Sequence, residues 1–290
     1  VRAGASSASP NGTASAPFPS INAALTAASQ GDTLQVAAGT YTENVIMFEA
    51  RTAGSIRYPA PGKNVNLLGG FSANFTQRDA KSNRTIIQAP TIVPNCAVAI
   101  VMESGKVTID GFSIQGGQGL DRSMSYQIGE GGGIYAAVGG TASLTLSHNE
   151  ISYNKALLDP ADGTRSASGG GVIIRGGGTG TVSILDNRIH HNESGRGAGI
   201  AVLATTATSM GRNWISENVG YSDHGGGAYI SAGAKPVFFR NVVLSNEIGH
   251  GWGGGMVVFG SGKAGETYTG YENVFSNTSA PLQGSGAFYD

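Results

Sequence analysis

The sequence predicts an all-β solenoid, in which short parallel strands are wound into a stack of similar coils. The prediction rests on a glycine triplet and an asparagine pair that recur together, and on short alternating segments between them. The triplet precedes an apolar residue and begins at Gly131, Gly169, Gly197 (as Gly-Ala-Gly), Gly225, Gly253 and Gly284 (as Gly-Ser-Gly). Successive triplets begin 38, 28, 28, 28 and 31 residues apart. A repeat of this length indicates a stack of similar structural units.

The asparagine pairs keep the same period as the triplets. They bound the segments 149–154, 187–192, 213–218 and 241–246, and a shorter segment, 274–277, closes the series. Stacked amides can hydrogen-bond from one coil to the next, and glycines permit tight turns and left-handed backbone conformations. We therefore expect both motifs to be structural rather than catalytic.

The segments between these motifs read as strands. They are short, rich in β-branched residues, alternate in polarity and end at Gly, Asn or Ser, whereas helical repeats need apolar residues at i, i+3, i+4 and i+7. With no room for crossover helices, parallel coils stacked about 4.8 Å apart follow. Two columns of inward core residues are expected: Ile134, Val172, Ile200, Ala228 and Met256, and Ile151, Ile189, Ile215 and Val243.

The N-terminal third is less regular. Residues 18–31 predict a short helix with Ser20 as N-cap and Gly31 as C-cap, and strands are expected at 33–36, 40–46, 64–68, 85–87 and 107–114. The helix would cap the open end of the stack, as terminal units of solenoids do. We expect one domain, 1–290, with the cap and first coil in 1–46, irregular coils in 47–130 and regular coils in 131–290.

Composition excludes several classes of protein. Charged residues make up 13% and the formal net charge is −1, which argues against a charged disordered chain and a basic nucleic-acid binder. No apolar run approaches 18 residues, so no membrane-spanning helix is expected. Cys96 is the single cysteine, which excludes an intramolecular disulfide and a Cys/His zinc motif. The chain begins at Val1 without a signal sequence, which fits a trimmed chain or a mature exported protein.

Two stretches carry a family resemblance. Residues 16–41, and Leu68-Gly69-Gly70-Phe71 followed by Arg78-Asp79, resemble the start of pectin-lyase-like right-handed parallel β-helix proteins. The glycine and asparagine repeats also resemble those of bacterial polymorphic outer-membrane proteins. The resemblance implies a single-stranded right-handed parallel β-helix with a short N-terminal capping helix. That superfamily includes lyases, hydrolases, epimerases and adhesive passengers, so the fold does not determine the function.

Chemistry is expected in the loops between the second asparagine and the glycine triplet. The residues that directly precede the triplets form the loop row: Glu130, Ser168, Arg196, His224 and Trp252. Stacking would place its members about one strand spacing apart, which suits an extended sugar chain. His224 or His250 is the candidate general base, because histidine titrates near neutral pH. Arg196 would neutralise a uronate carboxylate, and Glu130 or Asp223 would orient a histidine or act as an acid.

Other loop residues are candidates for substrate contacts. Trp252 and Tyr221 could stack on sugar rings, and Glu193, Arg165 and Tyr126 could hydrogen-bond to them. A calcium site near Asp223 and Glu193 is the alternative to a metal-free site, although no calcium motif is present. A row of mixed charges is also what an ordinary solvated edge contains. A second surface is expected on the outward side of the strands after the triplets, where an apolar stripe needs a cover: Tyr135, Ile173, Ala201, Tyr229 and Val257.

These residues predict a secreted or cell-surface bacterial lyase that cleaves an acidic polysaccharide by β-elimination. The alternative is a non-enzymatic β-helical adhesin, passenger or carbohydrate-binding surface protein, because residues 286–290 read as the first strand of another coil within a longer parent chain with further domains. The resemblance to pectin hydrolases would require paired aspartates, which the chain lacks; only Gly249-His250-Gly251 matches their motifs. The signatures of calcium pectate lyases are not recognisable either, so no catalytic residue is carried over from a family.

Overall fold

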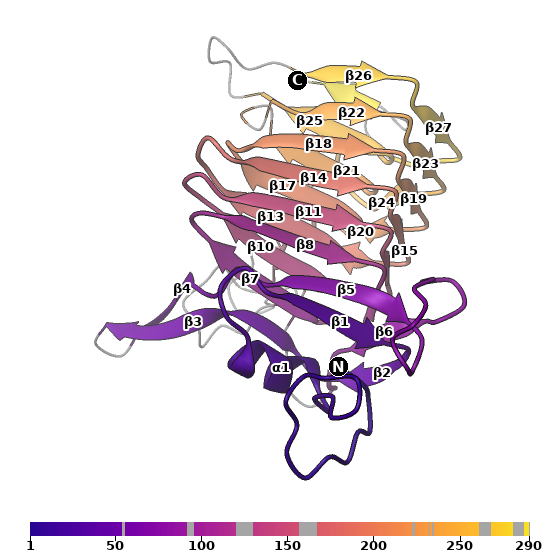
Figure 1. Cartoon of the computed structure of the whole chain (residues 1–290). Coiled ribbons are helices and arrows are strands. Elements are labelled where there is room, and N and C mark those ends of the chain that lie inside the picture. The colour runs from indigo at the N-terminus through magenta and orange to yellow at the C-terminus, as the bar shows by residue number, and fades with distance from the viewer. Residues whose placement is uncertain are drawn as a thin grey trace.

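The computed structural model is a stack of β coils with a short helix at its N-terminal end (Figure 1). It describes residues 1–53, 56–91, 96–119, 130–156, 167–221, 224–231, 233, 235–260, 268–280 and 287–289. Each regular coil contributes one strand to each of three parallel sheets, so strands that are neighbours in a sheet lie one coil apart in the sequence. The predicted all-β solenoid is therefore confirmed.

The described strands form three long sheets, named A, B and C here, and a small corner sheet. Sheet A runs through β1 (Thr33–Ala37), β5 (Asn66–Phe71), β8 (Lys106–Asp110), β11 (Ser143–Ser147), β14 (Thr181–Leu185), β18 (Ala207–Gly211), β22 (Val237–Phe239) and β26 (Thr269–Tyr271). Sheet B runs through β2 (Gly39–Thr42), β6 (Thr85–Gln88), β9 (Ser113–Gln115), β12 (Glu150–Ser152), β15 (Arg188–His190), β19 (Trp214–Ser216), β23 (Val242–Leu244) and β27 (Val274–Ser276).

Sheet C carries the strands that follow the glycine triplets. From the C-terminal end of the stack it runs through β28 (Ala287–Tyr289), β25 (Met256–Phe259), β21 (Ala228–Ser231), β17 (Ile200–Ala204), β13 (Val172–Gly176), β10 (Ile134–Val138), β7 (Val98–Met102), β3 (Val45–Ala53) and β4 (Ile56–Pro61). The corner sheet lies between sheets B and C and comprises β16 (Glu193–Ser194), β20 (Val219–Gly220) and β24 (Glu247–Ile248). The sequence did not predict these short strands, because two residues are too few to show an alternating pattern.

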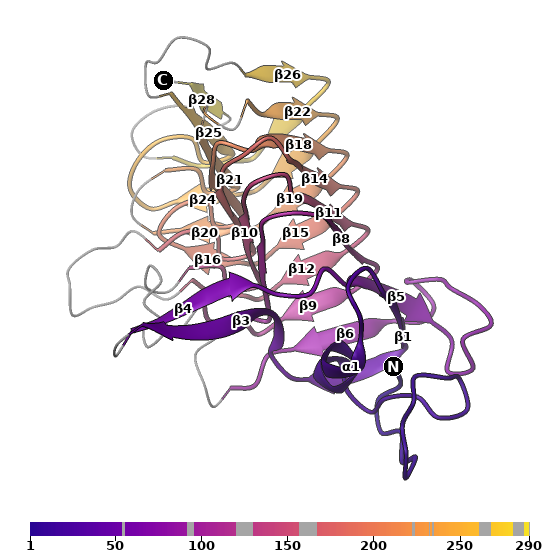
Figure 2. The same ribbon diagram turned by 60° about the vertical axis from the view of Figure 1, so that its left-hand side comes forward.

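Figure 2 shows how the three sheets enclose the interior of the stack. The side chains of the apolar core fill this interior. Both predicted inward columns are fully buried, from Ile134 to Met256 on sheet C and from Ile151 to Val243 on sheet B. They belong to one contiguous apolar cluster that extends from Val1 to Val258. Burial of aligned aliphatic side chains from coil to coil supplies the main force that stacks the coils.

The two asparagine columns form hydrogen-bonded ladders at the corners that flank sheet B. The first ladder comprises the buried residues Asn149, Asn187, Asn213 and Asn241. From Asn187 onward, each carboxamide oxygen accepts from the backbone N–H and the side-chain amide of the preceding member, at 2.9–3.1 Å. Asn154, Asn192, Asn218 and Asn246 form the second ladder in the same way. The structural interpretation of these columns is confirmed.

The ladders support a backbone conformation that non-glycine residues usually avoid. The residue just before each ladder asparagine has a φ between 50° and 57°, as at His148, Asp186 and His191. This left-handed conformation costs free energy for a residue with a Cβ, and the ladder bonds offset it. The shorter segment 274–277, which was predicted to close the series, left out the ladder member Asn273. Asn273 accepts from Asn241, whereas Asn277 is a left-handed corner residue with φ 50°.

The glycines of a triplet avoid steric clashes, although one triplet has alanine at its second position, Ala198. The first has a positive φ and lies against an outward side chain: a Cβ on Gly197 would come within 3.0 Å of the Ala201 Cβ. The second and third face backbone of the next coil, since a Cβ on Gly170 or Gly171 would come 2.4–2.5 Å from a carbonyl oxygen. Larger residues would therefore push adjacent coils apart.

The N-terminal end differs in detail from the prediction. Helix α1 (Ile21–Ala27) begins at the predicted N-cap, where Ser20 Oγ accepts from Ala23 N, but it ends with Ala28 as C-cap. Gly31 is therefore wrong as a C-cap; it has φ 87° and precedes β1. The predicted strand at 40–46 is two strands, because the chain turns where the Glu43 carboxylate accepts from Ile21 N at 2.7 Å and Asn22 N at 2.9 Å.

A hairpin and a terminal strand complete sheet C. Strands β3 and β4 pair antiparallel, and this hairpin projects from the N-terminal end of the stack in both views (Figures 1 and 2). The predicted last strand is confirmed, since β28 pairs parallel with β25.

Candidate functional site

The outer face of sheet C is buried along most of its length. The predicted apolar stripe runs along it, and its members are at most 8% exposed: Tyr135, Ile173, Ala201, Tyr229 and Val257. Tyr135, Ile173 and Ala201 form a second apolar cluster with Cys96 and Ala99, separate from the core inside the coils. The cover comes from the protein itself, because the first glycines of the triplets and the loop row fold back over this face.

The loop row is stacked as the sequence predicted. Isolated parallel β-bridges pair Ser168 with Arg196 and His224 with Trp252. The glycine N–H after each member donates to the carbonyl of the next member, with the Gly197 N to His224 O bond at 3.1 Å. Arg196, His224 and Trp252 therefore occupy the same corner on successive coils.

Glu130 begins the row as one half of a buried ion pair. Its side chain is 3% exposed and forms an ion pair with Arg175, which projects outward from β13. Burial raises the pKa of Glu130 above its ordinary value, even though hydrogen bonds from Arg175 and the charges of Arg175 and Arg196 act in the opposite direction. The carboxylate is therefore occupied by Arg175 rather than directed at a histidine.

Arg196 connects the row to the outward stripe. Its Nε donates to Ser168 Oγ at 2.8 Å, and its guanidinium carbon lies 5.1 Å from the centre of the Tyr229 ring. Its two terminal nitrogens make no hydrogen bond within the described part of the chain. They are oriented by two fixed contacts and can still bind a carboxylate in a bidentate manner.

His224, Tyr229, Trp252 and Phe259 form an aromatic platform on this face. The His224 and Trp252 rings are 4.7 Å apart and 9° from parallel, and the Tyr229 and Phe259 rings are 6.3 Å apart at 24°. His224 Nδ1 accepts from the Trp252 backbone N–H at 3.2 Å, so a neutral imidazole carries its proton on Nε2. Near the platform, a hollow of about 310 Å³ is lined by Leu203, Thr205, Tyr229, Ser231 and Phe259, among others.

The corner sheet brings together two candidate residues that the sequence analysis named separately, Tyr221 and Glu193. Tyr221 directly follows β20, and its hydroxyl donates a hydrogen bond to the Glu193 carboxylate. Lys155 Nζ lies 2.8 Å from the same carboxylate. Burial, together with the hydrogen bond and charge of Glu193, raises the pKa of Tyr221 to about 12. Burial alone would raise the pKa of Glu193, but the bonds from Lys155 and Tyr221 hold it below its ordinary value.

The remaining predicted residues are not brought into this arrangement. His250 is exposed and makes no hydrogen bond or ion pair with any other described residue. Tyr126, Arg165 and Asp223 lie outside the described residues. Within the described ranges, no group of three or more His, Cys, Asp or Glu side chains is placed to hold a metal ion. No helix in the described part of the structure is long and apolar enough to span a membrane.

Two contributors to the site were missed from the sequence. Phe259 lies two residues after Val257 on β25, and Arg175 two residues after Ile173 on β13, so both project from the outer face. They could have been predicted by extending the outward stripe to the next outward position, two residues further along each strand. Their partners in the loop row could not have been found, because those contacts depend on how the loops fold back.

The stacked parallel sheets, the asparagine ladders and the glycine corners define a parallel β-helix. A comparison with protein-family models matches the right-handed beta helix region to residues 77–280, which is 204 of the 290 residues. The chain therefore belongs to the right-handed beta helix family, and the predicted superfamily and handedness are confirmed. Searches of curated proteins and of solved structures found no significant match.

Proposed function

We propose that this protein is an exported carbohydrate-binding β-helix that holds an acidic polysaccharide against the loop row and the aromatic platform, beside sheet C. The aromatic platform carries the proposal, because a stack of nearly parallel aromatic rings beside a hollow concentrates apolar surface of the kind that sugar rings pack against. Arg196 lies over the Tyr229 ring of this platform, and its terminal nitrogens suit a uronate carboxylate.

Binding is favoured over catalysis by the state of the candidate acids and bases. A β-elimination needs a base that takes the proton next to the uronate carboxylate. His224 Nδ1 already accepts a backbone hydrogen bond, and Glu130 is engaged by Arg175. The platform and Arg196, by contrast, need no change in protonation to hold a sugar.

Lyase activity is the second candidate function, and one observation favours it. Arg196 and His224 lie on adjacent coils of the same face, so a group that neutralises a uronate and a group that can transfer a proton would contact neighbouring parts of one substrate. In this reaction the base removes a proton from carbon, a C=C bond forms, and the glycosidic oxygen leaves with a proton.

Binding can be measured by isothermal titration calorimetry with polygalacturonate and with neutral dextran. We expect Trp252→Ala and Phe259→Ala each to weaken binding of polygalacturonate roughly tenfold, the equivalent of losing one aromatic stacking contact. Tyr271→Ala is the matched control, because Tyr271 is an exposed aromatic residue on sheet A. Equal affinities for all three variants and the parent protein would refute the platform as the binding site.

The same samples distinguish binding from cleavage. Absorbance from new C=C bonds, followed with and without calcium, reports β-elimination on each polymer. If absorbance rises and His224→Ala abolishes the rise, the protein is a lyase; a flat trace with intact binding leaves carbohydrate binding as its function.

A further inference from the structure

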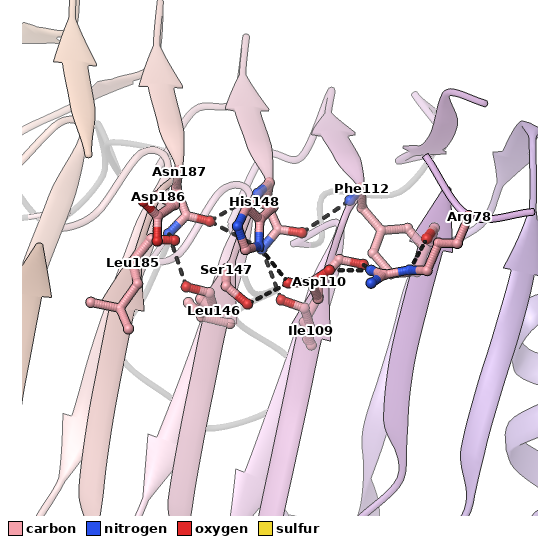
Figure 3. Close-up of polar contacts among 12 residues, drawn as sticks. Arg78, Ile109, Asp110, Phe112, Leu146, Ser147, His148, Leu185, Asp186 and Asn187 are labelled. Atoms are coloured by element: carbon pink, nitrogen blue, oxygen red, sulfur yellow. Dashed lines mark hydrogen bonds and ion pairs between the residues drawn. The ribbon is translucent and has the colours of Figure 1, made fainter. Parts of the chain in front are cut away.

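A second hollow lies on the opposite side of the stack, at the corner between sheets A and B. Its volume is about 510 Å³, and residues from successive coils line it. Figure 3 shows part of this corner, where His148 and Asp186 occupy equivalent turns of adjacent coils beside Phe112. None of the residues predicted from the sequence as site residues lines this corner hollow.

The two carboxylates of the corner hollow are already neutralised. Glu150 lies 2.9 Å from Arg84 Nη2 and 3.2 Å from His190 Nε2. Asp186 receives two hydrogen bonds from Arg212, at 2.8 and 2.6 Å. Acidic groups at this corner are therefore occupied by protein cations.

Two cations of the corner hollow are left without such partners. The Arg188 guanidinium on β15 is exposed and makes no hydrogen bond or ion pair with another described residue, although its charge contributes to holding the pKa of Glu150 below its ordinary value. The Lys81 ammonium likewise has no hydrogen-bond or ion-pair partner among the described residues. With both carboxylates neutralised, the charge that the hollow presents to a ligand is positive, which attracts an anionic group.

An exposed aromatic ring borders the corner hollow. Trp214 on β19 is in parallel register with Arg188, one strand spacing away, and is 43% exposed. The same outward column continues through Val242 to Val274, which is 55% exposed. The outer face of sheet B thus joins a positively charged hollow to a flat apolar surface.

We propose that the corner hollow binds an anionic saccharide, with its carboxylate or sulfate at Arg188 and Lys81 and a sugar ring against Trp214. Bidentate guanidinium contacts recognise planar oxyanions, and an indole face packs against the apolar face of a sugar ring. This site is separate from the aromatic platform, since sheet B and sheet C are different faces of the stack.

The two tryptophans allow each site to be observed separately. Trp214 borders the corner hollow and Trp252 belongs to the platform, and the chain has no other tryptophan. In the ¹⁵N-labelled protein each indole N–H gives one NMR signal, which Trp214→Phe and Trp252→Phe assign. A galacturonate hexamer, a sulfated dextran fragment and an unmodified dextran fragment of similar length are then titrated in.

We expect at least one anionic probe to shift the Trp214 signal with saturation, and the neutral fragment to leave it unchanged. A response to the hexuronate alone identifies a carboxylate site, and a response to the sulfated fragment alone identifies a sulfate site. Arg188→Gln should weaken that binding by about tenfold. Arg240→Gln is the control for overall charge, because it removes the same charge from an exposed arginine that is already ion-paired with Glu272.

The outcomes separate this proposal from the proposed function. A Trp252 shift with an unchanged Trp214 signal overturns the corner hollow as a site and leaves the platform intact. A Trp214 shift alone supports the corner hollow and refutes the platform. Equal losses for Arg188→Gln and Arg240→Gln would show attraction by overall charge alone, which also overturns the proposal.

Discussion

Removing one rung of an asparagine ladder should be among the most damaging single changes in this fold. Asn192 is fully buried, and its side chain makes four hydrogen bonds. Its Oδ1 accepts from Asn154 N at 3.1 Å and Asn154 Nδ2 at 3.0 Å, and its Nδ2 donates to Ile151 O at 2.9 Å and Asn218 Oδ1 at 3.0 Å. At about 1 kcal/mol for each bond, Asn192→Ala should lower the free energy of unfolding by about 4 kcal/mol.

The measurement is urea unfolding followed by far-UV circular dichroism and by tryptophan fluorescence. Agreement between the two probes is needed because stacked repeats can unfold in parts. Asn83→Ala is the control, since the Asn83 side chain makes no hydrogen bond to another described residue, and its effect should be within about 0.5 kcal/mol. Hydrogen exchange adds a local test: the Asn154 amide loses its acceptor and should exchange faster.

A loss below about 1 kcal/mol with unchanged protection of the Asn154 amide would refute this reasoning. It would mean that backbone bonds and core packing alone hold the corner, and that water replaces the carboxamide without cost. The ladder would then be a consequence of stacking rather than one of its causes.

Two further variants test buried charges, and their pH dependences should have opposite signs. Arg175→Met leaves the buried Glu130 without its partner and should cost about 3–5 kcal/mol at pH 7 in urea unfolding. Because the pKa of Glu130 is already raised by burial, the variant should regain stability as the pH is lowered through that pKa. Asp110→Asn should cost about 1.5–3 kcal/mol by removing the charged acceptor of Arg78, seen in Figure 3. Burial alone would raise the pKa of Asp110, but hydrogen bonds from Ser147, His148 and Arg78 hold it below the ordinary value of 3.8. The parent protein's advantage should therefore be full above the ordinary pKa of 3.8 and be lost progressively as the pH falls from there through the lower pKa of the folded state. Both predictions would be contradicted if the free energy of unfolding changed with pH in the same way in the parent protein and in the two variants.

The regular half of the fold follows from the spacing of a few residue types. A period near 28 in glycine and asparagine aligns identical chemistry on successive coils, and identical carboxamides stack with the same geometry at every step. The stacking of Arg196, His224 and Trp252 at one corner followed from that period alone. The β3 to β4 hairpin has no such period and was not predicted, because an isolated hairpin is specified by local turn chemistry and by what it packs against.

The sequence by itself determined which residues share a corner, because the recurring glycines and asparagines occupy equivalent turns in every coil, whether the coil is 28 or 38 residues long. Only the tertiary structure decided what those residues do there. Glu130 is paired with Arg175 and His224 is stacked on Trp252 because the loops fold back over sheet C, and the path of a loop is set by contacts distant in sequence. For the same reason the positive charge at Arg188 became visible only when the partners of the neighbouring carboxylates were known.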